Sequence, residues 1–167
     1  MSPTSVSWHD FTIRQVIPHQ GQMVLVDEII DFDPEGRIHS TILVPQWSLF
    51  HNEQREIPAF VGIEYMAQTV SAFFGMKRRM AGLPLEVGFL LGTRKMKVNV
   101  TSFHPSQQLR VEALQVYDYN GMSVFECQIF EHTETTVERS SLVQGKVNVY
   151  RPDDLETYLQ QQNRHEP

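Results

Sequence analysis

A carboxylic acid and a carboxamide lie one helical turn apart within an apolar stretch of the sequence. Glu64 and Gln68 belong to the segment 57–68, which reads IPAFVGIEYMAQ. Side chains four residues apart on a helix are neighbours, so we expect these two to meet on the flank of its apolar stripe. Burying a charged carboxylate costs on the order of several kcal/mol unless it is paired, hydrogen-bonded or protonated. Glu64 is therefore a candidate catalytic acid.

One long helix must position this pair. Helical periodicity runs over residues 59–80, and Pro58 and Gly82 stand where a helix begins and ends. A short helix is expected over residues 11–16, and a terminal helix is expected to begin at about Asp153. The sequence after Asn163 and the preceding glutamines, residues 160–163, are expected to form a frayed tail.

The remaining pattern predicts strands. The turn DPEG at residues 33–36 favours a hairpin of residues 23–30 and 37–44, followed by a loop over 45–56. A meander of four strands is expected over the ranges 87–100, 108–117, 123–132 and 138–149. One helix between a hairpin and a meander indicates an α+β fold in which a curved antiparallel sheet wraps around the helix, the hotdog arrangement.

Composition restricts the function classes. The 167 residues are 41% hydrophobic and carry a formal net charge of −6, so we expect one domain spanning 1–167 and no nucleic-acid partner. The single cysteine, Cys127, cannot form an internal disulfide, which favours a reducing, cytoplasmic setting. No apolar stretch reaches the roughly 20 residues of a membrane span, and the first ten residues do not resemble a signal peptide. We expect no membrane partner.

Two segments carry a resemblance to a known family. The segment 57–68, with its glutamate and glutamine, resembles the central-helix motif of hotdog-fold 3-hydroxyacyl-[acyl-carrier-protein] dehydratases. The segment 17–28, IPHQGQMVLVDE, is similar to their opening segment, and GFLLGTR at 88–94 extends the likeness over nearly the whole chain. The resemblance is to the divergent branch associated with aryl polyene clusters.

The sequence also departs from that family. The fatty-acid dehydratases have a catalytic His in a His-Phe-Pro-Gly loop, whereas here the loop 50–58 reads FHNEQREIP. Ala59 stands where the family has a glycine that opens the helix. The resemblance therefore assigns the acid to Glu64 by motif, and the base to His51 by position alone. His19, in the matching Pro-His pair, is the reserve base.

The resemblance implies a dehydration that needs no metal or other cofactor, with the substrate carried on the phosphopantetheine of an acyl carrier protein. A histidine base would remove the C2 proton, and a partly desolvated glutamic acid would protonate the leaving hydroxyl. Backbone N–H groups at the start of the helix, in Ala59, Phe60 and Val61, would hold the thioester oxygen. The base and acid would come from different subunits of a homodimer, or of a heterodimer with a paralogous hotdog subunit.

Each assignment has a structural alternative. Glu64 could simply interact with the positive end of the helix dipole. His51 could be a solvated loop residue, and His19 could brace the chain before a strand. Gln68 could orient Glu64 or line a dimer contact. We also expect Gln68, Gly88 and Phe89 to contribute to substrate binding.

Three functions remain open from the sequence. The first is dehydration of 3-hydroxyacyl-acyl carrier protein to the trans-2-enoyl product in fatty-acid or polyene-type biosynthesis. The second is an acyl thioesterase, because hotdog thioesterases also use an acid on the central helix. The third is a non-catalytic hotdog subunit that supports a partner dehydratase, which the altered His51 loop would suit.

Overall fold

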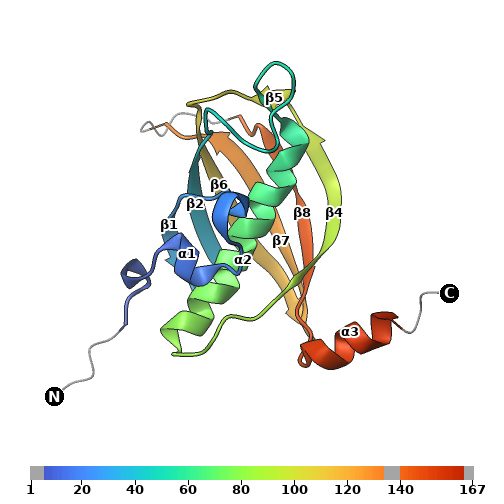
Figure 1. The fold of residues 1–167 in the computed structure, drawn as a ribbon. Coiled ribbons are helices and arrows are strands. Elements are labelled where there is room, and N and C mark those ends of the chain that lie inside the picture. The colour runs from blue at the N-terminus through green and yellow to red at the C-terminus, as the bar shows by residue number, and fades with distance from the viewer. Residues whose placement is uncertain (1–5, 134–139, 164–167) are drawn as a thin grey trace.

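The computed structural model describes residues 6–133 and 140–163. A curved antiparallel sheet wraps around one long helix, α2 (Gly62–Met80), which continues from the 3-10 turn η3 (Ala59–Val61) (Figure 1). The six strands of the sheet follow the order β1-β2-β6-β7-β8-β4. They are β1 (Glu28–Asp33), β2 (Arg37–Leu43), β4 (Phe89–Val98), β6 (Gln108–Tyr119), β7 (Met122–Glu131) and β8 (Val143–Tyr150). This confirms the predicted hotdog fold.

Short elements complete the fold. A two-stranded sheet pairs β3 (Ile57–Pro58) with β5 (Ser102–Phe103), just before η3. The helix α1 (Ile13–Val16) packs against α2, and η1 (Trp8–Asp10) precedes it. The turn η2 (Gly21–Met23) leads toward β1, and α3 (Leu155–Asn163) follows β8 at one end of the sheet (Figure 1).

The ends of α2 lie where the sequence places them. Pro58 occupies the N-cap position of η3, where a missing N–H leaves no helical hydrogen bond unmade. At the other end Gly82 has a φ of +70°, and the N–H of Leu83 donates to the carbonyl of Arg78 at 2.9 Å. This is a Schellman ending, which needs a residue that tolerates positive φ and so favours glycine.

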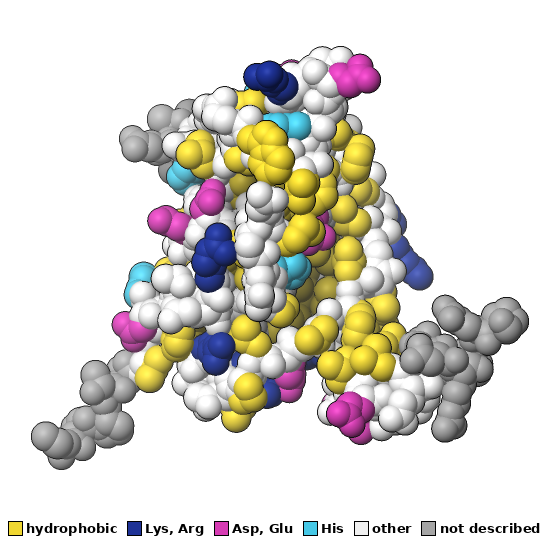
Figure 2. Space-filling model, viewed as in Figure 1, with side chains coloured by type: hydrophobic (Ala, Val, Ile, Leu, Met, Phe, Trp, Pro, Cys, Tyr) yellow, Lys and Arg dark blue, Asp and Glu magenta, His cyan; other side chains and the backbone are white. Residues whose placement is uncertain are grey.

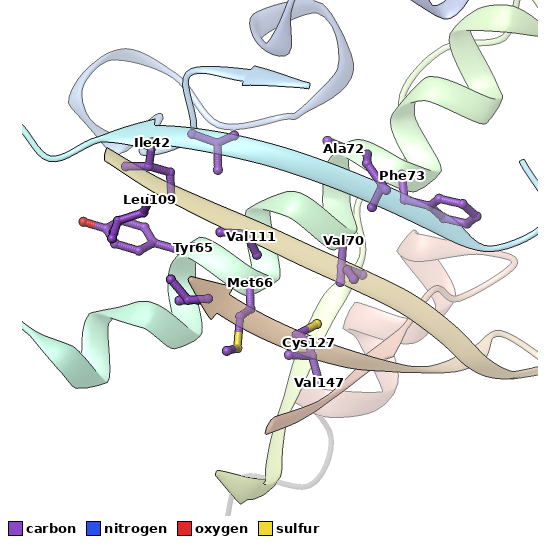
Figure 3. Packing of buried hydrophobic residues seen from close by; sticks show 14 of the residues in the cluster. Ile42, Tyr65, Met66, Val70, Ala72, Phe73, Leu109, Val111, Cys127 and Val147 are labelled. Atoms are coloured by element: carbon purple, nitrogen blue, oxygen red, sulfur yellow. The ribbon is translucent and has the colours of Figure 1, made fainter. Parts of the chain in front are cut away.

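The core lies between α2 and the concave face of the sheet (Figure 3). Met66, Val70 and Phe73 are fully buried on α2 and face buried side chains of β2, β6, β7 and β8. Cys127 on β7 is buried within this core, and its burial raises the pKa of the thiol. Within the described residues, no helix is both long enough and apolar enough to span a bilayer.

Three sequence expectations about the elements are wrong. The strand expected over residues 23–30 begins only at Glu28, because Met23 lies in η2 and the backbone after it is hydrogen-bonded to a side chain of α2. The meander has three strands, since β4 crosses to the far edge and pairs with β8. Residues 160–163 belong to α3, whose first turn is capped by Asp154 through the N–H of Thr157 at 3.2 Å. Part of the expected strand 138–149 lies outside the described residues.

Gly75 allows α1 and α2 to touch, so we predict that Gly75→Ala is strongly destabilising. A Cβ at this position would lie 1.7 Å from the carbonyl oxygen of Val16, a backbone atom that cannot rotate away. The free energy of unfolding should fall by about 3 kcal/mol, at the upper end of overpacking costs. Chemical denaturation measures this change.

Gly82→Ala is the matched control. A Cβ on Gly82 would meet no atom within 4 Å, so the cost should be only that of its positive φ, about 1 kcal/mol. Equal losses in the two variants would contradict the close approach of α1 to α2.

Candidate active site

His19 and Glu64 of the same chain face each other. The histidine Nε2 lies 3.5 Å from Oε1 of the glutamate, and their side chains are 29% and 30% exposed. His19 is in the extended segment between α1 and η2, and Glu64 is in the first turn of α2. Nδ1 of His19 is buried and has no hydrogen-bond partner among the described residues, so Nε2 is the nitrogen that can meet a substrate.

Gln68 fixes this pair in place. Its Nε2 donates to Oε1 of Glu64 at 3.0 Å and to the carbonyl of Met23 at 2.6 Å. Its Oε1 accepts the N–H of Leu25 at 2.9 Å. The side chain is fully buried, and these bonds satisfy both its amide nitrogen and its amide oxygen. Of the two roles expected for Gln68, the structure favours orientation of Glu64.

A cavity of about 120 Å³ opens beside the pair. On the α2 side, Ala67, Ser71 and Phe74 line it at helical spacing below Glu64. The remaining lining residues are Pro18, His19, Val70, Gly75, Arg78, Glu86, Gly88, Leu90, Val149 and Arg151. Figure 2 shows the hollow beside the central helix, with mostly hydrophobic side chains around it and acidic and histidine side chains at its margin. The site therefore joins His19 and Glu64 to a cavity with apolar side chains along much of its lining and further charged side chains from Arg78, Glu86 and Arg151.

His51 does not join this cavity within the chain. Its Nδ1 accepts the N–H of Ser48 at 3.2 Å, which places the proton of a neutral ring on Nε2. That Nε2 is buried and has no partner among the described residues. A ring in this state can donate a proton through Nε2, but its one lone pair is already engaged. Within the chain, the histidine that lies beside Glu64 is therefore His19 and not His51.

The three backbone N–H groups expected to hold the thioester oxygen, those of Ala59, Phe60 and Val61, have different surroundings. The Ala59 N–H, which was expected to hold the thioester oxygen, donates to the carbonyl of Thr101 at 3.0 Å, next to the paired strands β3 and β5. Phe60 is exposed and Val61 is buried, and both lie in the first turn of the helix that continues into α2. N–H groups in a first turn have no acceptor within the helix.

Of the two substrate-binding residues expected at the start of β4, Gly88 and Phe89, only Gly88 lines the cavity. Gly88 lines the cavity, where its missing side chain leaves room beside Arg151. Phe89 packs instead on Tyr158 of α3, with ring centroids 5.0 Å apart. Sequence reasoning missed Ser71, Arg78, Glu86 and Arg151 as lining residues. Ser71 and Arg78, which lie on α2, could have been found by counting helical turns along the sequence from Glu64.

No metal site accompanies the pair. Within residues 6–133 and 140–163, no three His, Cys, Asp or Glu side chains are grouped so that they could hold an ion.

The chain belongs to the ApeP dehydratase family, whose sequence profile matches residues 11–160. This confirms the prediction of a hotdog dehydratase of the aryl-polyene type.

Solved structures support the fold. The chain is similar to a chain of the dehydratase heterocomplex ApeI:P from Xenorhabdus doucetiae, with a TM-score of 0.80 and 24% identity over 93% of this chain and 99% of that one. A hypothetical thioesterase from Streptococcus pneumoniae, solved with coenzyme A, gives a TM-score of 0.55 and 11% identity over 74% and 84% of the two chains. The PaaI protein of Escherichia coli gives a TM-score of 0.54 and 12% identity, over 74% of this chain and 81% of that one.

Loss of the Gln68 amide should destabilise the protein. Gln68→Leu would leave the carbonyl of Met23 and the N–H of Leu25 without their partners, and each such loss costs about 1–3 kcal/mol. We predict that the free energy of unfolding falls by about 2–6 kcal/mol, measured by chemical denaturation.

Gln160→Leu, on the exposed surface of α3, is the control and should change the free energy of unfolding by less than about 0.5 kcal/mol. A Gln68→Leu variant as stable as the wild type would show that the bridge does not hold the two segments together.

Proposed function

We propose that the protein removes water from 3-hydroxyacyl chains carried on acyl carrier protein and forms the trans-2-enoyl thioester. The observation that carries this proposal is the His19–Glu64 pair, 3.5 Å apart at the margin of a cavity with a mostly apolar lining. Dehydration needs one base and one acid within reach of adjacent carbon atoms. Membership of the ApeP dehydratase family supports the same reaction.

The two groups have separate roles in this proposal. Nε2 of His19 takes the C2 proton, while the protonated carboxyl of Glu64 gives its proton to the departing C3 hydroxyl. Because both groups lie on one side of the cavity, both act on the same face of the substrate. The bond Gln68 donates to Oε1 holds the carboxyl, leaving Oε2 for the leaving group.

The thioester carbonyl requires a hydrogen-bond donor as the C2 proton leaves. The N–H groups of Phe60 and Val61 are the proposed donors, because the first turn of a helix combines unpaired N–H groups with the positive end of its dipole. Ala59 is excluded from this role by its bond to Thr101.

A partner subunit belongs to the proposal. The strand β4 lies at one edge of the six-stranded sheet, next to the cavity, and its Leu90 and Leu91 are exposed. Such an edge offers backbone groups for pairing with another strand. The similar ApeI:P structure is a heterocomplex. We propose that a paralogous hotdog subunit or a second copy pairs with β4.

The His19–Glu64 pair also bears on the two alternative functions, a non-catalytic subunit and a thioesterase. An acid and an imidazole held together at a cavity are typical of active sites, so the pair favours an enzyme over a non-catalytic subunit. A thioesterase would use the same cavity but would release free thiol from saturated acyl thioesters, which a dehydratase does not.

We predict that Glu64→Gln and His19→Ala each lower the rate of water loss by about 10²- to 10⁴-fold, the usual contribution of an acid or base. The rate of water loss should fall far less in His51→Ala than in His19→Ala. Mass spectrometry of 3-hydroxyacyl-acyl carrier protein measures the loss of water, with the protein tested alone and together with its paralogous subunit.

His104→Ala serves as the control, since His104 is exposed and pairs with Glu56 away from the cavity. Full loss in His51→Ala with activity kept in His19→Ala would reject His19 as the base. Absence of turnover by the wild-type protein, both alone and together with its paralogous subunit, would reject the dehydratase proposal.

Subunit pairing can be tested at β4. Leu91→Lys should raise the dissociation constant of the dimer at least about tenfold, because burial of a leucine contributes about 1.5–3 kcal/mol. Leu114→Lys on β6 is the matched control, as Leu91 and Leu114 are 50% and 51% exposed. Analytical ultracentrifugation measures both. A weaker dimer in Leu114→Lys alone would place the interface elsewhere.

A further inference from the structure

The cavity is long but holds little volume. Its α2 lining extends from Glu64 to Arg78, a span of about 21 Å at 1.5 Å per residue. Its volume of about 120 Å³ is smaller than an engineered cavity of about 150 Å³ that takes up one benzene molecule. An acyl chain much longer than about six carbon atoms therefore exceeds this volume, and it must either extend past the present walls or displace one of them.

Most of the walls are fixed. On one side α2 is held by the core, and its residues Val70 and Phe73 are fully buried. On the other side Leu90 of β4 is paired in register with Val149 of β8. Moving either wall would break strand pairing or core packing.

The wall at the far end from His19 and Glu64 is different. Residues 83–88, here called the distal segment, form neither helix nor strand, and Leu83 and Val87 in it are exposed. One side chain of α2 clasps this segment. Arg78 donates from Nε to the carbonyl of Pro84 at 2.7 Å, and its Nη1 lies 2.5 Å from Oε1 of Glu86.

Both contacts of the clasp are partly open to solvent. The Arg78 and Glu86 side chains are 25% and 45% exposed, so their separation exchanges protein contacts for water contacts at a small cost. The distal segment is thus a wall of the cavity that can be displaced without breaking strand pairing or core packing.

We propose that the Arg78 clasp selects acyl chains by length: short chains fit while the distal segment is clasped, and long chains bind only when it is released. This inference rests on the proposed function, because it takes the cavity beyond His19 and Glu64 as the acyl site. Arg78 and Glu86 are then specificity-determining residues at a distance from the chemistry.

Binding of two inert ligands tests the clasp without catalysis. The ligands are the amide analogues of butanoyl- and dodecanoyl-pantetheine, which can be neither dehydrated nor hydrolysed at the thioester position. Calorimetry would measure the dissociation constants for the wild type, Glu86→Ala and Arg78→Met. The ratio of dodecanoyl to butanoyl affinity should rise by up to about fivefold in Glu86→Ala, because an exposed ion pair contributes about 0.2–1 kcal/mol. It should rise further in Arg78→Met, which loses both contacts.

Glu126→Ala is the matched control, since Glu126 is 51% exposed and forms a comparable ion pair with Lys146 at 2.9 Å on the sheet. Its affinity ratio should equal that of the wild type. An unchanged ratio in Glu86→Ala and Arg78→Met, with both variants folded by circular dichroism, would overturn the proposal. An equal gain for both ligands would also overturn it. A length effect without water loss from 3-hydroxyacyl substrates would reject the dehydratase proposal and leave the clasp standing.

Discussion

The buried side chain of Gln68 is the contact on which the site depends. Its amide joins Glu64 on α2 to the backbone at Met23 and Leu25, which follows His19 in the chain. Without it, the carbonyl of Met23 and the N–H of Leu25 would need other partners, and the segment that follows His19 would lose this link to the helix. A fully buried amide with three satisfied bonds is rigid, because each of its bonds would be costly to lose.

The helix α2 contacts the hydrophobic core with one face and the cavity with the neighbouring face. One stripe, with Met66, Val70 and Phe73, packs on the sheet and supplies the apolar burial that holds the fold. The neighbouring stripe, with Glu64, Ala67 and Phe74, faces the cavity, and it is less tightly covered. The partial charge at the start of the helix and the polar pair in its first turn lie at one end of the cavity, and the Arg78 clasp lies at the other.

The sequence was sufficient for features that depend on local chemistry. The ends of α2 followed from Pro58 and Gly82, and the turn at residues 33–36 predicted the hairpin of β1 and β2. Glu64 and Gln68 were expected to meet because four residues make one helical turn, and they do. The hotdog arrangement followed from one long helix among strands.

The rest depended on contacts between distant segments. The pairing of β4 with β8 joins residues far apart in the chain, so no local pattern could show it. Which histidine lies beside Glu64 within the chain also depends on tertiary geometry, since His19 faces Glu64 whereas Nδ1 of His51 accepts the Ser48 N–H. Similarly, the bond from Ala59 to Thr101 exists only because β3 and β5 pair.

The central claim is that His19 is the base and works beside Glu64 of its own chain. A 3-alkynoyl thioester of pantetheine tests it directly: removal of the C2 proton and reprotonation at C4 give a conjugated allene, which the adjacent imidazole then attacks to form a covalent adduct. Peptide mapping by mass spectrometry locates that adduct. The account predicts the label on His19, and a label on His51 in place of His19 would contradict it.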